Sequence, residues 1–86
     1  MMSIDAGDTV RHLPSGEEWI VAALSVDGMH LYACGWPETM AKLSDCELIE
    51  KASTDQRIVI LTEAAKSGGA RARAAQSALE RGGYAN

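Results

Sequence analysis

The stretch WIVAALSVDGMHLYACGW, from Trp19 to Trp36, decides the fold of this chain. It consists of two apolar runs joined by Asp27-Gly28, and this dipeptide between apolar runs is the strongest short-range signal for a β-hairpin. A two-residue turn fixes how the strands pair, so that Leu24 lies opposite Leu31. The sequence therefore predicts an antiparallel hairpin whose side chains alternate between two faces.

The predicted register gives the hairpin two different faces. The aliphatic face, expected to join the core, consists of the pairs Val26/Met29, Leu24/Leu31, Ala22/Ala33 and Ile20/Gly35. The amphipathic face, which carries most of the aromatic side chains of the chain, consists of Ser25/His30, Ala23/Tyr32, Val21/Cys34 and Trp19/Trp36. We expect the aromatic face to be either a binding surface or a second core layer beneath a later helix.

Charge is distributed unevenly along the 86 residues. Residues 1–65 hold four Lys/Arg and eleven Asp/Glu, whereas residues 66–86 hold four Lys/Arg and one Asp/Glu. Duplex DNA binding needs a stripe of basic side chains that displaces counterions, so the acidic body argues against it. The basic residues near the C-terminus, including Arg71 and Arg73, are expected to form a solvated helix face, with phosphate contact as the alternative.

Five short strands are expected within residues 5–50, separated by turns rich in Gly, Pro and Asp. Their predicted bounds are Thr9–Leu13, Trp19–Val26, Met29–Cys34, Thr39–Leu43 and Cys46–Glu50. Strands joined this tightly predict a mainly β fold, a small SH3-like five-stranded antiparallel barrel, because closure hides the sheet edges. The alternative is an open antiparallel sheet covered by a C-terminal helix.

A helix over residues 54–66 is predicted by the capping-box pattern of Ser53-Thr54-Asp55-Gln56. The β-branched run from Ile58 to Leu61 leaves a strand as the alternative. In a helix, Val59 and Ile60 lie away from the stripe that covers the sheet. This leaves a second apolar side for a partner, for another helix or for a second copy in a homodimer.

Residues 70–81 predict a second helix or a flexible tail, because their apolar content is nearly all alanine and gains little from burial. The chain is short enough that we expect a single domain over residues 1–86.

Motifs for catalysis or metal binding are not found in the sequence. His30 and Cys34 are four residues apart on one predicted strand, about 13 Å, so they cannot share an ion or act as a nucleophile and base. The chain has neither a Cys-x-x-Cys pair nor a phosphate-binding loop with its lysine. We therefore expect no enzyme activity, no cofactor and no metal.

The N-terminal stretch is acidic and lacks the apolar core of a signal peptide, and no run is long enough to span a membrane. These features predict a cytoplasmic protein in which Cys34 and Cys46 are reduced thiols.

Several motifs resemble those of small, mostly uncharacterised proteins encoded by bacteriophages and prophages. They are GDTVRH at residues 7–12, PSGE at 14–17, CGWP at 34–37, AKL at 41–43 and DCELI at 45–49. The resemblance covers roughly residues 7–50 and leaves the C-terminal third outside. It implies an SH3-like barrel, a phage origin, the cytoplasm of a bacterial host cell, and no catalytic residues.

This resemblance and the apolar surface lead to the hypothesis of a non-enzymatic protein that docks on a bacterial host protein as an anti-defence inhibitor, for example an anti-CRISPR protein. One alternative is a nucleotide-binding protein that stacks the base on the aromatic face and holds the phosphate with a C-terminal arginine. A second alternative, a module for single-stranded nucleic acid, is disfavoured by the acidic body. The predicted binding residues are Trp19, His30, Tyr32, Trp36, Pro37, Arg71 and Arg73.

Overall fold

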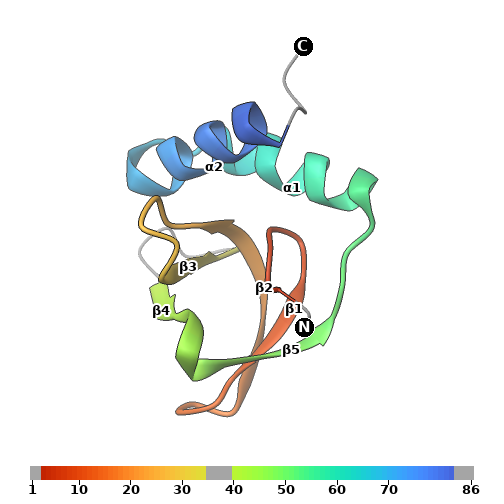
Figure 1. Ribbon diagram of the computed structural model, residues 1–86, viewed down its shortest axis with the longest axis vertical. Coiled ribbons are helices and arrows are strands. Elements are labelled where there is room, and N and C mark those ends of the chain that lie inside the picture. The colour runs from red at the N-terminus through yellow and green to blue at the C-terminus, as the bar shows by residue number, and fades with distance from the viewer. Residues whose placement is uncertain (1–2, 35–39, 83–86) are drawn as a thin grey trace.

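A five-stranded antiparallel sheet carries two helices on one side (Figure 1) in the computed structural model, which describes residues 3–34 and 40–82. The strands are β1 (Thr9–His12), β2 (Glu17–Leu24), β3 (His30–Ala33), β4 (Met40–Lys42) and β5 (Cys46–Glu50). A 3₁₀ turn, η1 (Leu43–Asp45), precedes β5, and the helices are α1 (Thr54–Ala65) and α2 (Gly69–Arg81).

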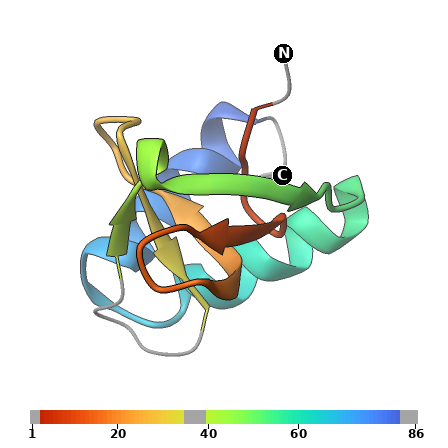
Figure 2. The same ribbon diagram turned by 90° about the horizontal axis from the view of Figure 1, so that it is seen from below.

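The sheet is open. The strand order is β4-β3-β2-β1-β5, so that β4 and β5 lie at opposite ends and no pairing joins them within the described residues. Strand β2 is shared between two halves of the sheet, because it pairs with β1 over its first part and with β3 over its second. Figure 2 shows β5 beside β1, with α1 on the far side of these strands. The prediction of five antiparallel strands followed by C-terminal helices is confirmed, and closure into a barrel is not observed.

The turn of the β2–β3 hairpin is longer than predicted. The Ser25 N–H donates to the His30 carbonyl oxygen (2.9 Å), which leaves a four-residue loop from Val26 to Met29. A two-residue type I′ turn needs a positive φ at both central residues, but among the described residues only glycines have one, and Gly28 has φ 74°. The loop projects into solvent, so the predicted core positions of Val26 (71% exposed) and Met29 (66%) are wrong.

A β-bulge in β2 reverses the faces of its first half. Leu24 pairs with Leu31 as predicted, but the register shifts between Val21 and Ala23, so that Val21 rather than Ala22 lies opposite Ala33. One extra residue exchanges the two faces of every residue beyond it. Val21 therefore lies in the core, and the prediction that Ile20 lies there is wrong, because this side chain is 48% exposed.

Two apolar clusters result. The strand cluster lies within the curved sheet and consists of Val10, Val21, Leu31 and Ala41, with partly buried Ile4, Trp19, Leu24, Leu43 and Cys46 around it. The helix cluster lies between the sheet and the helices and consists of Ala6, Ala22, Ala23, Leu61, Ala64, Ala74 and Ala75, with Tyr32, Ala65, Ala78 and Leu79 packed against it.

Helix α1 begins at the predicted capping box. The Ser53 hydroxyl accepts a hydrogen bond from the Gln56 N–H (3.1 Å), and the Gln56 side-chain oxygen accepts one from the Ser53 N–H (3.1 Å). The β-branched run from Ile58 to Leu61, for which a strand was the alternative prediction, is therefore helical. Leu61 is buried, whereas Val59 is 60% exposed, as expected for the side of the helix that does not cover the sheet.

The carboxylate of Asp8, which is fully buried, holds the start of α1 against the sheet. It accepts hydrogen bonds from the Ala52 N–H (2.7 Å), from Lys51 Nζ (2.9 Å) and from Arg57 Nη2 (3.0 Å). Burial alone would raise the pKa of Asp8, but the hydrogen bonds from Ala52 and Lys51 hold it below the usual value. Gly7 is required beside it, because its φ is 88° and a Cβ there would lie 2.9 Å from Ala52 Cβ.

Candidate functional site

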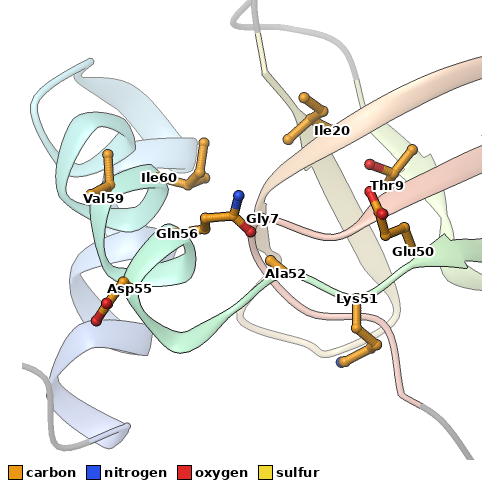
Figure 3. A pocket seen from close by; sticks show the side chains of 10 residues that line it. All are labelled: Gly7, Thr9, Ile20, Glu50, Lys51, Ala52, Asp55, Gln56, Val59 and Ile60. Carbon is orange, nitrogen blue, oxygen red and sulfur yellow. The ribbon is translucent and has the colours of Figure 1, made fainter.

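A groove of about 520 Å³ opens between α1 and the strands β1 and β2 (Figure 3). Its lining combines three aliphatic side chains with several polar ones and two small residues at its base. The lining residues are Gly7, Thr9, Ile20, Glu50, Lys51, Ala52, Asp55, Gln56, Val59 and Ile60.

The apolar side chains of the groove come from both of its walls. Ile20 lies on β2 and is half exposed, because the bulge turns it away from the strand cluster. Val59 and Ile60 lie on α1, and Figure 3 shows Ile60 and Gln56 extending from the helix toward the strands. Exposed apolar side chains gathered around a hollow are typical of a surface that binds another molecule.

The groove continues along α1 into a second hollow of about 180 Å³. Ile60 lines both hollows, and the second one adds Ala22, Cys34, Glu63, Ala64 and Arg71. The combined surface therefore follows α1 from Asp55 to Glu63, with β2 as the opposite wall. We call this surface the α1 groove.

The cations of the α1 groove are bound within the fold. Lys51 Nζ donates to Asp8 and to the Ser3 carbonyl oxygen (2.7 Å), and Figure 3 shows its side chain directed away from the hollow. Arg71 Nη1 donates to the Ala33 carbonyl oxygen (3.1 Å), and Arg71 Nε donates to the Ser67 hydroxyl (3.3 Å). Lys51 is thus paired with a carboxylate, whereas Arg71 is bonded to two neutral oxygens and keeps its positive charge.

The acids of the α1 groove are exposed. They are Glu50 at the end of β5, Asp55 in the first turn of α1 and Glu63 in its third turn. Within the described part of the chain, none of the three carboxylates takes part in an ion pair, since the observed pairs involve other residues. The groove therefore has an apolar centre and negative charge at its rim.

The aromatic residues predicted as one platform lie in two different clusters. Trp19 packs against the strand cluster and stacks on His12, with ring centroids 4.3 Å apart and 14° between the ring planes. Tyr32 packs against the helix cluster. Trp36 and Pro37 lie outside the described residues. The bulge separates Trp19 from Tyr32, so these two rings form no shared surface.

His30 lies at the start of β3, beside the hairpin loop. Its Nδ1 is 3.3 Å from Asp27 Oδ2, and Ser25 Oγ donates to Asp27 Oδ1, which also accepts from the Met29 N–H (2.8 Å). The hydrogen bond from Ser25 lowers the pKa of Asp27. The Ser25 hydroxyl is thus bonded to the carboxylate and not to the imidazole, so these residues close the loop and do not form a nucleophile and base pair.

The predicted phosphate-binding arginines differ in position. Arg71 is buried and bridges α2 to β3 through the Ala33 carbonyl, whereas Arg73 is exposed on α2.

Cys34 lies at the surface beside Arg71. Desolvation raises the pKa of its thiol, and the Arg71 charge partly offsets this rise. A raised pKa lowers the fraction of reactive thiolate.

The sequence predicted one wall of the α1 groove. Val59 and Ile60 lie off the covering stripe of the predicted helix, which identified a second apolar side. Ile20 had no such signal, because the strict alternation of a regular hairpin places it in the core. Its exposure depends on a bulge at Ala22, where neighbouring alanines fit either register.

Comparison of the chain with models of protein families, with curated proteins and with solved structures found no match. Of the helices in the described part of the chain, neither is long and apolar enough to cross a membrane. Over residues 3–34 and 40–82, no three side chains of His, Cys, Asp or Glu are grouped so that they could hold a metal ion.

Proposed function

We propose that this protein is a non-enzymatic binding protein that docks on a protein of a bacterial host through the α1 groove and inhibits a host defence system. The observation that carries the docking step is the exposure of Ile20 and Val59 on opposite sides of one hollow. Burial of apolar surface is the main driving force of protein association, and a few residues at the centre of an interface supply most of the binding energy.

The choice of a host protein rests on the resemblance of residues 7–50 to proteins encoded by phages and prophages. Many small proteins of this origin act by binding a host factor. The strand order β4-β3-β2-β1-β5 and the 3₁₀ turn before β5 support the proposal that the sheet is an opened relative of the SH3-like barrel.

The nucleotide-binding alternative has less support from the arrangement of the side chains. It needs stacked aromatic rings beside a free arginine. Arg73 is exposed, but Trp19 and Tyr32 lie in separate clusters, and Arg71 donates to Ala33 and Ser67. Docking through the α1 groove needs no rearrangement of these residues.

The docking step is tested by photo-crosslinking. A benzophenone amino acid is placed at Val59 in one version of the full chain and at Val26 in another. Both valines are exposed, but only Val59 lines the groove, so position 26 is a matched control. After irradiation in bacterial lysates, we expect a defined crosslinked protein from position 59 and not from position 26.

The crosslinked protein is then purified, and its Kd is measured for the wild type, for Val59→Asp and for Val26→Asp. We expect Val59→Asp to weaken binding about tenfold or more, since it places a charge in the contact, and Val26→Asp to change Kd by less than about twofold. Equal effects of the two variants, or the absence of a crosslinked protein in every lysate, would contradict docking through the groove.

The anti-defence part is tested by phage plating. Expression of the wild type in bacteria that carry a defence system should raise the number of plaques, and Val59→Asp should abolish this increase. An increase that persists with Val59→Asp would assign the inhibition to another surface.

A further inference from the structure

We infer that the α1 groove binds a cationic protein segment that inserts an aliphatic side chain between Ile20 and Ile60. This inference rests on the proposed function and adds the chemistry of the partner. Three properties of the groove lead to it: the apolar centre, the inner strands that carry Thr9 and Ile20 in its wall, and the sign of the charge at the rim.

Recognition in the α1 groove proceeds through side chains and not through strand addition. Adding a strand requires an edge with unpaired backbone groups. Thr9 and Ile20 in the wall of the groove lie on inner strands, since β1 lies between β5 and β2, and β2 lies between β1 and β3. The edge strand β5 reaches the groove only with its last residue, Glu50. At Ile20 itself the carbonyl oxygen accepts a hydrogen bond from the Cys34 N–H (2.8 Å). The partner therefore contributes a protruding side chain.

The apolar centre fits an aliphatic side chain. Ile20 approaches from the sheet, and Val59 and Ile60 approach from α1, so an inserted group meets methyl and methylene groups on two sides. Gly7 and Ala52 add no polar side chain to the lining, and the side-chain oxygen of Gln56 accepts a hydrogen bond from the Ser53 N–H.

The rim selects positive charge around that anchor. Glu50 lies on the strand side, with its side chain beside Thr9 in Figure 3, and Glu63 lies on the helix side of the second hollow. Lys51 is paired with Asp8, and Arg71 adds one positive charge against the three acids, so the net charge of the rim stays negative. Lys or Arg next to the anchor would pair with the acids, whereas acidic neighbours would be repelled.

A second copy of the chain fits this charge pattern less well. A symmetric contact through α1 places the same patch on both sides of the interface, so that Asp55 and Glu63 of one copy face the acids of the other. A homodimer is therefore an outcome that the experiment must separate from a cationic partner.

The test is a selection from a random peptide library against the full chain, with the enriched peptides measured against three proteins. These are the wild type, the charge reversal Glu50→Lys/Glu63→Lys and the control Val26→Asp. We expect enriched peptides with net positive charge around one aliphatic residue. The double variant should weaken their binding about tenfold, and the control should weaken it less than about twofold.

Salt provides a second measurement with the same peptides. Exposed ion pairs are screened as ionic strength rises, so Kd should increase about fivefold between about 0.05 M and about 0.5 M NaCl for the wild type. For Glu50→Lys/Glu63→Lys this dependence should vanish or reverse. Replacing the aliphatic residue of the peptide with serine should abolish binding to every version.

Other results would overturn the inference. Neutral or acidic enriched peptides, or binding that is unaffected by the double variant, would show that the groove does not select positive charge. The proposed docking through the groove would still hold if Val59→Asp weakens binding of the crosslinked protein. The two results are independent, because one uses a protein from the lysate and the other uses library peptides. No enrichment, together with a concentration-dependent dimer that Val59→Asp disrupts, would assign the groove to a second copy.

Discussion

The strand cluster and the helix cluster bury different kinds of side chain. Leu31, Val10 and Val21 fill the first, whereas the second is mostly alanine around the single large residue Leu61. Apolar burial stabilises roughly in proportion to area, at about 25 cal/mol per Å², so the alanine-rich cluster contributes less for each residue. Apolar burial thus stabilises the strand cluster more strongly, while the position of α1 also depends on the polar contacts of Asp8.

The largest effects are expected for the two buried leucines. Leu31→Ala should lower the free energy of unfolding by about 4 kcal/mol, and Leu61→Ala by about 3 kcal/mol, because the helices around Leu61 can shift to fill part of the space. Urea unfolding measures both values. In Leu61→Ala, the amides of α1 and α2 should exchange their hydrogens faster than those of the strands. Equal acceleration of exchange in helices and strands would mean that the two clusters do not differ in stability.

Asp8→Asn should lower the free energy of unfolding by about 3 kcal/mol, since it removes a buried carboxylate that pairs with both Arg57 (3.0 Å) and Lys51 (2.9 Å). Glu18→Gln is the control, because it breaks the exposed pair between Glu18 and Arg11 (3.2 Å) and should cost less than about 1 kcal/mol. Similar costs for the two variants would mean that Asp8 does not hold α1 in place.

Arg71→Met should cost about 2 kcal/mol, because the methionine keeps the apolar stem but leaves the Ala33 carbonyl oxygen without its donor. Arg73→Met, on the exposed side of the same helix, should change the unfolding free energy by less than about 0.5 kcal/mol. A larger loss of unfolding free energy for Arg73→Met than for Arg71→Met would mean that the contact between Arg71 and Ala33 does not stabilise the fold.

The smallest effect is a dependence on pH. The pKa of Asp8 is lower in the folded protein than its usual 3.8, so the unfolded chain binds the proton first as the solution is acidified. The stability from ionised Asp8 is present above pH 3.8 and is lost as the pH falls further toward the folded pKa. The difference in unfolding free energy between wild type and Asp8→Asn should therefore be constant from about pH 7 to pH 5 and narrow below 3.8. A constant difference down to the acid transition would contradict this.

Local signals in the sequence predicted several elements well. Strand β5 has its predicted bounds, Cys46–Glu50, and the hydrogen bonds at Ser53 and Gln56 are those of the predicted capping box. These features depend on a few neighbouring residues whose chemistry allows one arrangement. The exposure of Val59 followed from helical geometry alone.

The hairpin faces could not be predicted in the same way. Ala22 and Ala23 are both small and both buried in the helix cluster, so either could be the residue that a bulge adds. The choice is made by tertiary packing, which places Val21 against Leu31 and turns Ile20 toward α1. The α1 groove depends on this one-residue shift, and so does the separation of Trp19 from Tyr32.

The register shift in β2 is tested most directly by the solvent exposure of two neighbouring residues with methyl groups, Ile20 and Val21. In methyl NMR with a soluble paramagnetic agent, we expect strong relaxation of the Ile20 methyl signals and little change for those of Val21, which is fully buried. Strong relaxation of Val21 with protection of Ile20 would mean that the hairpin is regular, and the α1 groove would lose its wall on the sheet.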